Sequence, residues 1–524
     1  MFVVFTFLHS LWIKILRRTD RFLPLTKSRR HYAQENLSAS SNQANQEIAS
    51  ACQVRKERTL IRAAATPAFS ILLLIYIGIF LMQSFFPQLW LNHIMAGCAL
   101  LACLASLKQV RRPTLLLSML LTGSGFLLML QGNPQPLDWS RAAIHNASLI
   151  CLVLTVPLLG SILAFEPYAS YLTLITERYI TSPFRLYSAA ALLTSALSSL
   201  LNLASMHFVH HLLQPRAAKC PPALFSQALF RGFMPNVMWS PSYISVAIAI
   251  QYSGISWFSL APVGISLALT GVVWALLLGW FEYGKLAAFS TGEVSEKDRL
   301  RRPSDIDRTA AVRGVWTLLS MILLLISLIV FLEYYTHKSA LVLVPLISFT
   351  GPMLLSRIYG KSAVYSTQFR QYVAEKLPRA HNEMLLFSAI GFFGYALAGS
   401  SFPAQIPLLV SRFGLDTPLK IALLIVGIII MFAAIGIHPM ITIAAISSAM
   451  PPGSTALSGQ QLAGTFLVGY MFYGICSPFS ATNLIMASLT AQNPIVAGLR
   501  QNGLFALIYV LLALCLLLLL FAAG

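Results

Sequence analysis

Long apolar stretches dominate this chain, and they leave a lipid bilayer as the environment in which it can fold. Hydrophobic residues make up 57% of the 524 positions and charged residues only 10%, whereas soluble domains carry about 25% charged residues. A helix needs about 20 apolar residues to cross a bilayer. The sequence therefore predicts an all-α polytopic membrane protein. Full spans are expected at 67–85, 88–106, 113–131, 147–165, 257–281, 314–333, 340–357, 384–400 and 497–521.

Two polar, proline-containing breaks interrupt other apolar segments. The first runs from Arg231 to Ser242 and the second from Tyr473 to Asn483. Their Ser-Pro pairs begin at Ser240 and Ser477, 237 positions apart (477 − 240). Breaks at corresponding places in two halves of a membrane protein indicate an internal repeat, and they are the best sequence pointer to a transporter binding site.

A further pair of irregular segments lies upstream at the same spacing. Asn202, within 201–205, corresponds to Pro439, within 436–440. Inside hydrocarbon every backbone N–H and C=O needs a partner, so non-helical backbone is tolerated only where protein buries it or where it lines a wet cavity. Broken helices also expose N–H groups that bind anions and carbonyls that bind cations. Four such segments predict a solute site with room for a coupling ion.

Basic residues predict the topology. The net charge of +19 would suggest a nucleic-acid partner in a soluble chain, but the Lys and Arg lie in tails and loops such as 107–112, 282–313 and 358–383, as the positive-inside rule expects. If one segment of each break-containing pair folds back as a re-entrant hairpin, the chain crosses about eleven times. The N-terminus is then inside, the C-terminus is outside, and the two halves form an inverted repeat.

Six regions follow from this pattern. Residues 1–16 are apolar and precede several arginines, the reverse of a signal peptide, so we expect an interfacial or partly inserted helix there. The regions are a basic cytoplasmic segment at 1–66, scaffold helices of the first repeat at 67–186, its transport core at 187–281, a basic cytoplasmic loop at 282–313, scaffold helices of the second repeat at 314–416, and its transport core at 417–524.

Motifs of catalysis and metal binding are not found. The seven Cys form no CxxC pair, and no Ser/His/Asp set, HExxH or Walker motif occurs, so we expect neither an enzyme nor a cofactor or metal. The 17 acidic residues lie outside the four irregular segments, which argues against a carboxylate proton relay there. His207, His210 and His211 have helical spacing that could hold a metal, but an interfacial cluster is the simpler interpretation.

The order of these elements resembles the ion transporter superfamily, and within it the divalent-anion/sodium symporters, over roughly residues 67–521. Three spans, an interfacial helix, a re-entrant hairpin, a discontinuous helix and a final span are given twice. The resemblance implies hairpins at 187–212 and 417–450 and broken helices at 222–253 and 459–494. It also implies a homodimer in which a transport core moves as an elevator against a scaffold.

By the same resemblance, solute and ions lie between the hairpin tips and the helix breaks. The Ser-Asn-Thr tip signature of those symporters is absent from both hairpins. The implied contacts are Asn202 and Ser205 at the first tip, Asn236, Ser240 and Ser242 at the first break, His438 and Thr442 at the second tip, and Ser477, Ser480, Thr482 and Asn483 at the second break.

The expected function is secondary active transport of a small, carboxylate-like anion across the cytoplasmic (inner) membrane, coupled to Na⁺ or H⁺. One alternative is a proton-coupled exporter or antiporter of the same fold for a neutral or amphipathic solute. Another is a membrane-embedded enzyme with His438 or His207 as base. The absence of a carboxylate partner for those histidines in the sequence pattern disfavours the enzyme.

Overall fold

The computed structural model describes residues 67–132, 134–217, 220–286, 308–405, 412, 414, 417–450 and 457–522. The predicted basic segment at 1–66 lies outside these residues, as do 287–307 of the predicted cytoplasmic loop and several residues near the end of the region expected at 314–416. The described residues belong to one compact unit, Thr66–Gly524.

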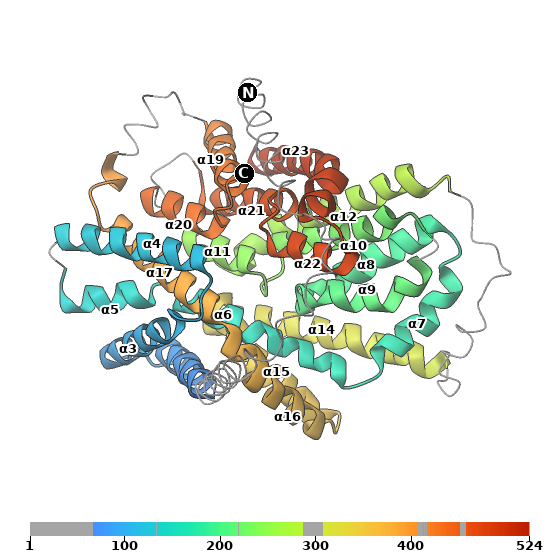
Figure 1. Ribbon diagram of the computed structural model, residues 1–524, viewed down its shortest axis with the longest axis horizontal. Helices are drawn as coiled ribbons and strands as arrows, with labels where there is room; N and C mark the ends of the chain where they lie inside the picture. Colours follow the sequence, from blue (N-terminus) through green and yellow to red (C-terminus); the bar gives the residue numbers. More distant parts are fainter. Residues whose placement is uncertain are drawn as a thin grey trace, which may run out of the picture. The chain divides into compact units, whose positions relative to one another are not determined.

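Every regular element in this described part of the chain is a helix (Figure 1). Ten helices there are long and apolar enough to cross a membrane, so the prediction of an all-helical, multi-pass membrane protein is confirmed. The side of the membrane on which each terminus lies stays a prediction.

The first half contains Pro67–Phe85, α3 (Leu89–Ser106), α4 (Arg112–Gln131), α5 (Pro136–Ile144), α6 (Ala147–Thr155), η1 (Val156–Ala164), α7 (Tyr168–Tyr179), α8 (Pro183–Leu201), α9 (Ala204–Ala217), α10 (Pro222–Phe233), η2 (Met234–Met238), α11 (Ile244–Ser253) and α12 (Trp257–Tyr283).

The second half ends, like the first, in a pair of tip helices, a broken helix and a long final helix. It contains α14 (Arg308–Thr336), α15 (Ala340–Ile358), α16 (Ser362–Gln371), η3 (Tyr372–Lys376), η4 (Leu377–Arg379), α17 (His381–Ala398), η5 (Pro403–Gln405), α19 (Pro418–Ala434), α20 (Pro439–Ala449), α21 (Gly459–Cys476), α22 (Ala481–Thr490), η6 (Val496–Arg500) and α23 (Gln501–Ala522).

The spacing of 237 residues reappears in the helix boundaries. Helix α21 begins 237 positions after α10, and α22 begins and ends 237 positions after α11. Gly254 and Ala491, which follow α11 and α22, also differ by 237 and both have a positive φ. The internal repeat seen in the Ser-Pro pairs therefore extends through the helices on both sides of each break.

We divide the helices into two groups, which also contact each other, as α17 does α20. We call α8 to α12 together with α19 to α23 the inner bundle, and Pro67–Phe85, α3 to α7 and α14 to α17 the outer helices. Within the inner bundle α8 packs against α10 and α12, α19 against α21, and α12 against α23. Among the outer helices α17 packs against α3, α4 and α5, and α14 packs against α7. Both tips and both breaks lie in the inner bundle.

A buried polar cluster around Arg231 joins the two halves of the inner bundle. The guanidinium of Arg231 (1% exposed) donates to both carboxylate oxygens of Glu282 on α12, at 2.7 and 3.1 Å. It also donates to Asn502 Oδ1 at 3.0 Å and to the carbonyl of Gln501 at 3.2 Å, both on α23. One side chain of α10 thus ties the final helix of each repeat to the first broken helix.

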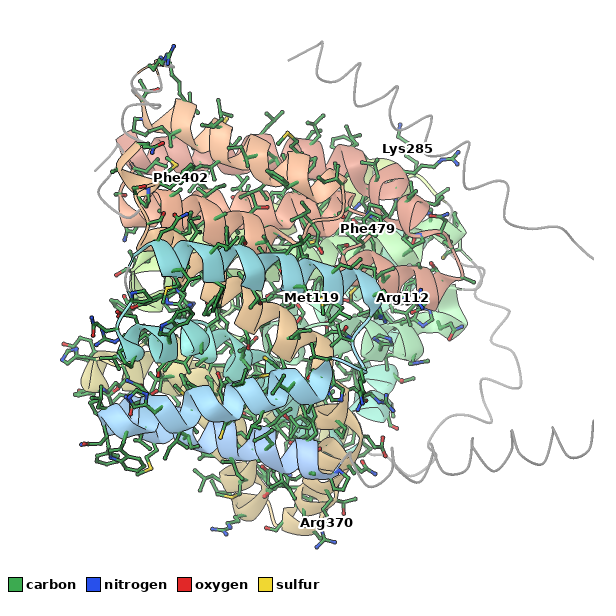
Figure 2. All side chains as sticks on the ribbon, turned by 60° about the vertical axis from the view of Figure 1, so that its left-hand side comes forward. Arg112, Met119, Lys285, Arg370, Phe402 and Phe479 are labelled. Atoms are coloured by element: carbon green, nitrogen blue, oxygen red, sulfur yellow. The ribbon has the colours of Figure 1, made fainter. Side chains whose placement is uncertain are left out.

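Apolar side chains cover the surface of several outer helices. Figure 2 shows Met119 on the outside of α4, with Arg112 at the start of the same helix. On that helix Leu116, Leu120 and Leu127 are 63%, 70% and 63% exposed. In water such a face would be unfavourable, whereas lipid tails solvate it at no cost. This surface is that of a helix in contact with lipid.

Candidate functional site

The first tip is a sharp turn between α8 and α9. Helix α8 ends at Leu201, and Asn202 follows it with φ of 51° and ψ of −134°. Asn tolerates positive φ better than most residues, so it suits a turn that reverses the chain within a few residues. The hydroxyl of Ser205 donates to the carbonyl of Asn202 at 2.7 Å, which secures the start of α9.

The first break separates α10 and η2 from α11, and its polar side chains bind the backbone of α8. Ser240 Oγ donates to the carbonyl of Ser199 at 2.7 Å, and Ser242 Oγ reaches the same carbonyl at 3.1 Å. The amide of Asn236 donates to the carbonyl of Ser195 at 2.9 Å. These side chains pair the carbonyls at the end of α8 and so hold the break against the tip.

The second tip lies between α19 and α20 and is organised by His438. The Nδ1 atom of His438 accepts from the backbone N–H of Met440 at 3.2 Å and caps α20. In the neutral ring the proton is therefore on Nε2. The ring packs edge-on against Tyr470 and Tyr473, with centroids 6.0 and 5.5 Å away. Nearby in the sequence, the hydroxyl of Thr442 is buried without a hydrogen-bond partner among the described residues.

The second break separates α21 from α22. Ser480 Oγ donates to the carbonyl of Gly474 at 2.9 Å and accepts from the backbone N–H of Asn483, so it caps α22. The amide of Asn483 donates to the carbonyls of Ile475 and Ser477 at 2.8 and 2.9 Å. Its Oδ1 atom is buried and has no partner within the described part of the chain.

Ser240 and Ser477, the repeat-related pair, make equivalent contacts. Each hydroxyl donates to a carbonyl close to the C-terminal end of the preceding tip helix, Ser199 of α8 and Ala433 of α19, the second at 3.1 Å. Both serines are buried, at 0% and 2% exposure. The same hydrogen bond between a break and the preceding tip helix therefore occurs in both repeats.

We expect Ser240→Ala and Ser477→Ala each to lower the free energy of unfolding by about 1 kcal/mol, because each removes one buried hydrogen bond. A second donor, Ser242 Oγ or the Gly436 N–H, still pairs each carbonyl. Denaturant-induced unfolding in detergent measures the change. Ser320→Ala is the matched control, since that exposed hydroxyl bonds only to the carbonyl of Thr317 in its own helix. An equal effect of all three substitutions would show that the hydrogen bonds between breaks and tips do not stabilise the fold specifically.

A cavity of about 750 Å³ lies where both tips and both breaks approach the outer helices. Five of the eleven predicted site residues line it: Asn202, Ser242, His438, Ser480 and Thr482. The other six do not line this cavity: Ser205, Asn236, Ser240, Thr442, Ser477 and Asn483. The four irregular segments thus meet at one space, although about half of the polar residues in them face elsewhere.

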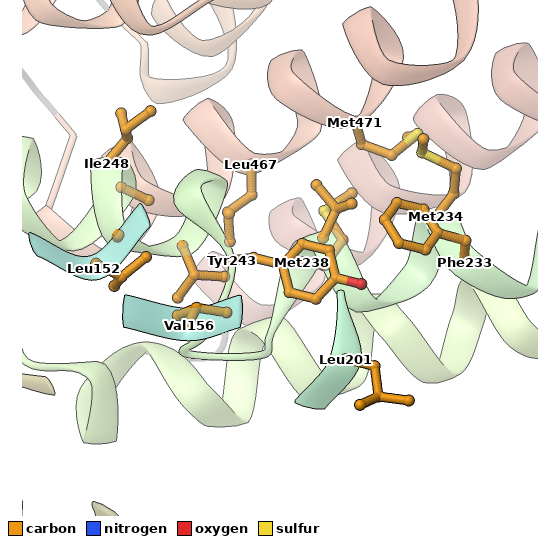
Figure 3. Close-up of a cluster of buried hydrophobic side chains, with 14 of the residues drawn as sticks. Leu152, Val156, Leu201, Phe233, Met234, Met238, Tyr243, Ile248, Leu467 and Met471 are labelled. Carbon is orange, nitrogen blue, oxygen red and sulfur yellow. The ribbon is translucent and has the colours of Figure 1, made fainter. Parts of the chain in front are cut away.

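Most of the cavity wall is apolar or aromatic. Figure 3 shows Leu152, Val156, Leu201, Phe233 and Tyr243 converging from α6, η1, α8, α10 and the residue before α11, and all five line the cavity. The aromatic pair Tyr470 and Tyr473 lines it as well. A solute in this space would therefore contact mainly hydrophobic surface, with polar groups at the tips and breaks.

Charged side chains of the outer helices line the same cavity, and these were missed by the sequence interpretation. Arg111, Glu375, Lys376 and Glu383 all contribute to its wall. The first three are exposed, so they mark its open end. Burial raises the pKa of the Glu383 carboxyl, which its own backbone N–H and the Arg111 guanidinium lower in part. The only sequence signal was the position of Glu383 directly before an apolar stretch.

The histidines of α9 form an aromatic cluster. The rings of His210 and His211 lie 5.6 Å apart, and His210 stacks on Phe225 at 5.5 Å. No group of three or more His, Cys, Asp and Glu side chains that could hold a metal occurs in the described ranges.

Trp239, beside the first break, donates its indole N–H to Asn236 Oδ1 at 2.9 Å.

Comparisons with known proteins give a distant likeness in structure. No family model matches the sequence, and no curated protein matches it. Among solved structures, the chain is similar to the YdaH transporter of Alcanivorax borkumensis, whose crystal structure was described as having an unusual topology. The likeness covers 79% of this chain and 99% of that one, with 13% sequence identity and a TM-score of 0.47. A likeness this weak carries no argument about function.

Proposed function

We propose that this protein is a secondary transporter in which the cavity between the inner bundle and the outer helices binds the solute. The observation that carries the proposal is the meeting of both tips and both breaks, related by the 237-residue repeat, at one cavity of about 750 Å³. Irregular backbone at membrane depth is tolerated where it lines such a space. Repeated halves around one site are the arrangement that alternating access requires.

The cavity favours an amphipathic organic anion as the solute. Its volume is in the usual range of about 300–1,000 Å³ for sites that hold drug-sized molecules, and its wall is largely apolar. Helices α11 and α22 both begin at the cavity, where Ile244 and Ala481 contribute to its wall. The positive ends of two helix dipoles favour a negative group there, and the His438 imidazole adds a donor.

We extend the proposal to the conformational state, the membrane and the transport mechanism. The exposed basic residues at the open end belong to loops expected in the cytoplasm, so the structure would represent an inward-open state in a cytoplasmic membrane. We propose that the inner bundle moves as an elevator within a homodimer and that a cation is coupled to its movement. Catalysis is disfavoured because the described contacts of His438 are with Tyr470, Tyr473 and a backbone N–H, none of which is a carboxylate.

Ligand-dependent unfolding of the full chain in detergent tests the solute class. Benzenesulfonate is an aromatic anion, benzyl alcohol is a neutral aromatic, and succinate is a small dianion. We expect benzenesulfonate to stabilise the protein, by about 2.7 kcal/mol at a hundredfold excess over its Kd, and the other two to do so much less. Stabilisation by succinate alone would favour the small carboxylates expected from the sequence.

A tyrosine variant locates the binding. We expect Tyr473→Ala to weaken benzenesulfonate binding about tenfold, since losing an aromatic contact costs about 1.4 kcal/mol. Tyr334→Ala is the matched control, because Tyr334 is 65% exposed on α14. Counterflow of labelled benzenesulfonate in proteoliposomes then separates carriage from binding. Binding that Tyr473→Ala leaves unchanged would place the solute outside this cavity.

A further inference from the structure

One carboxylate oxygen on the outer-helix side of the cavity has no hydrogen-bond partner among the residues that the structure describes. Glu383 lies in the first turn of α17 and lines the cavity. Its Oε2 atom is buried without a hydrogen-bond partner among the described residues. By contrast, the buried carboxylate of Glu333 accepts from the backbone N–H groups of Trp257 and Phe258 at 3.1 and 3.2 Å. A buried carboxylate oxygen without a donor is costly unless a proton or a cation neutralises it.

The charges around Glu383 leave it unneutralised. Arg111 lowers its pKa in part, but no ion pair joins these two described side chains. Helices α6 and α20, which pack with α17, contain no Asp, Glu, Lys or Arg. Other titratable groups occur on α17 itself and on elements that pack against it or adjoin it along the chain: His93, Cys98, Cys103, Lys108, Arg112, Asp138, Arg141, Cys151, Tyr372, Glu375, Lys376, Arg379, His381, Tyr395 and His438. Of these, Asp138 contacts Tyr395 near the opposite end of α17.

We propose that Glu383 binds the proton that is coupled to transport, an assignment that rests on the proposed transport function. A proton from water reaches the carboxylate through the open cavity and forms an O–H bond at the unpartnered oxygen. The neutral acid is then compatible with closure of the apolar cavity around it. Neutralising Glu383 also leaves Arg111 as an uncompensated positive charge at that end, which favours entry of an anion. Proton and anion are therefore taken up together.

A hydrophobic carbodiimide reports the protonation directly. Dicyclohexylcarbodiimide adds to a protonated carboxyl: the proton moves to a carbodiimide nitrogen and the carboxylate oxygen bonds to the central carbon. The product rearranges to a stable N-acylurea that peptide mass spectrometry locates. We expect an adduct at Glu383 in the full-length protein that declines as the pH rises through the raised pKa of this carboxyl. The absence of an adduct across a pH series from acidic to neutral would overturn the proposal.

Glu375 provides a matched control because it lines the same cavity but is exposed. We expect little adduct at Glu375 at neutral pH, and Glu375→Gln should leave labelling of Glu383 unchanged. Equal labelling of both residues with the same pH dependence would contradict a distinct proton site. Glu383→Gln removes the reactive group and keeps a similar shape, so it serves as the test variant in transport.

Transport separates the coupling role from the function on which it rests. In proteoliposomes an imposed pH gradient should drive accumulation of benzenesulfonate, which remains anionic at all relevant pH. We expect Glu383→Gln to retain counterflow but to lose accumulation driven by the gradient. Accumulation that survives Glu383→Gln unchanged would overturn the coupling role alone. An adduct at Glu383 in a protein that carries no solute would overturn the transport function and the coupling role with it.

Discussion

Replacing Arg231 with alanine is expected to destabilise the protein by about 1.5–3 kcal/mol, because the hydrogen bonds that its buried guanidinium donates to a carboxylate and to an amide oxygen are lost. The guanidinium is 1% exposed and donates to Glu282, Asn502 and the carbonyl of Gln501. Its loss leaves Asn502 Oδ1 without this donor and the partly exposed Glu282 carboxylate without its cation, at the junction of α10, α12 and α23. The carbonyl of Gln501 keeps its hydrogen bond from Gln227. Thermal or denaturant-induced unfolding in detergent measures the change.

A second ion pair provides the comparison for Arg231. Lys361 contacts Glu166 at 3.0 Å, but the two side chains are 34% and 36% exposed, so Lys361→Ala should cost only about 0–1 kcal/mol. The double variant Arg231→Met with Glu282→Leu removes both charges and should recover most of the lost stability. If Arg231→Ala cost no more than Lys361→Ala, the buried cluster would not be what joins the two repeats.

The spans and breaks could be predicted from the sequence because each depends on local composition. A run such as 340–357 is long enough to cross a bilayer and apolar enough to remain in it, and the structure forms α15 over Ala340–Ile358. Pro235 and Pro241 lack an N–H and weaken a helix, and together with the polar residues beside them they predict the first break. Proline alone is not sufficient, since Pro345 and Pro352 lie inside α15. The 237-residue separation of Ser240 and Ser477, which also relates the two upstream irregular segments, indicated the repeat without any three-dimensional information.

The cavity wall could be predicted only in part because it depends on which way side chains point. Asn236 and Ser240 are small polar residues at a break, like Ser242 and Ser480. All four side chains donate to backbone carbonyls, but only Ser242 and Ser480 also line the cavity. A hydroxyl in an apolar segment bonds to backbone as readily as to a solute. Glu383 was missed for a related reason, since it comes from a helix far from the breaks in sequence.

A glycine in the first broken helix is the position at which a single methyl group should do the most harm. A Cβ atom on Gly232 would lie 2.2 Å from the carbonyl oxygen of Ala191 and 2.8 Å from its Cα. These are backbone atoms of α8, which cannot rotate away, so α8 and α10 must separate. Overpacking of this kind costs about 1–3 kcal/mol, and sometimes more. We expect Gly232→Ala to approach or exceed the upper end of that range.

The effect should reach the cavity because α8 carries the first tip and supplies the carbonyls that hold the first break. Gly232→Ala should therefore weaken the stabilisation by benzenesulfonate as well as the fold itself. Gly123→Ala makes the same chemical change on α4, where a Cβ would meet nothing within 4 Å. There the lower backbone entropy of alanine should add about 0.5–1 kcal/mol of stability. Opposite signs for the two substitutions are the expected result, and a similar gain at Gly232 would show that α8 and α10 are not in close contact.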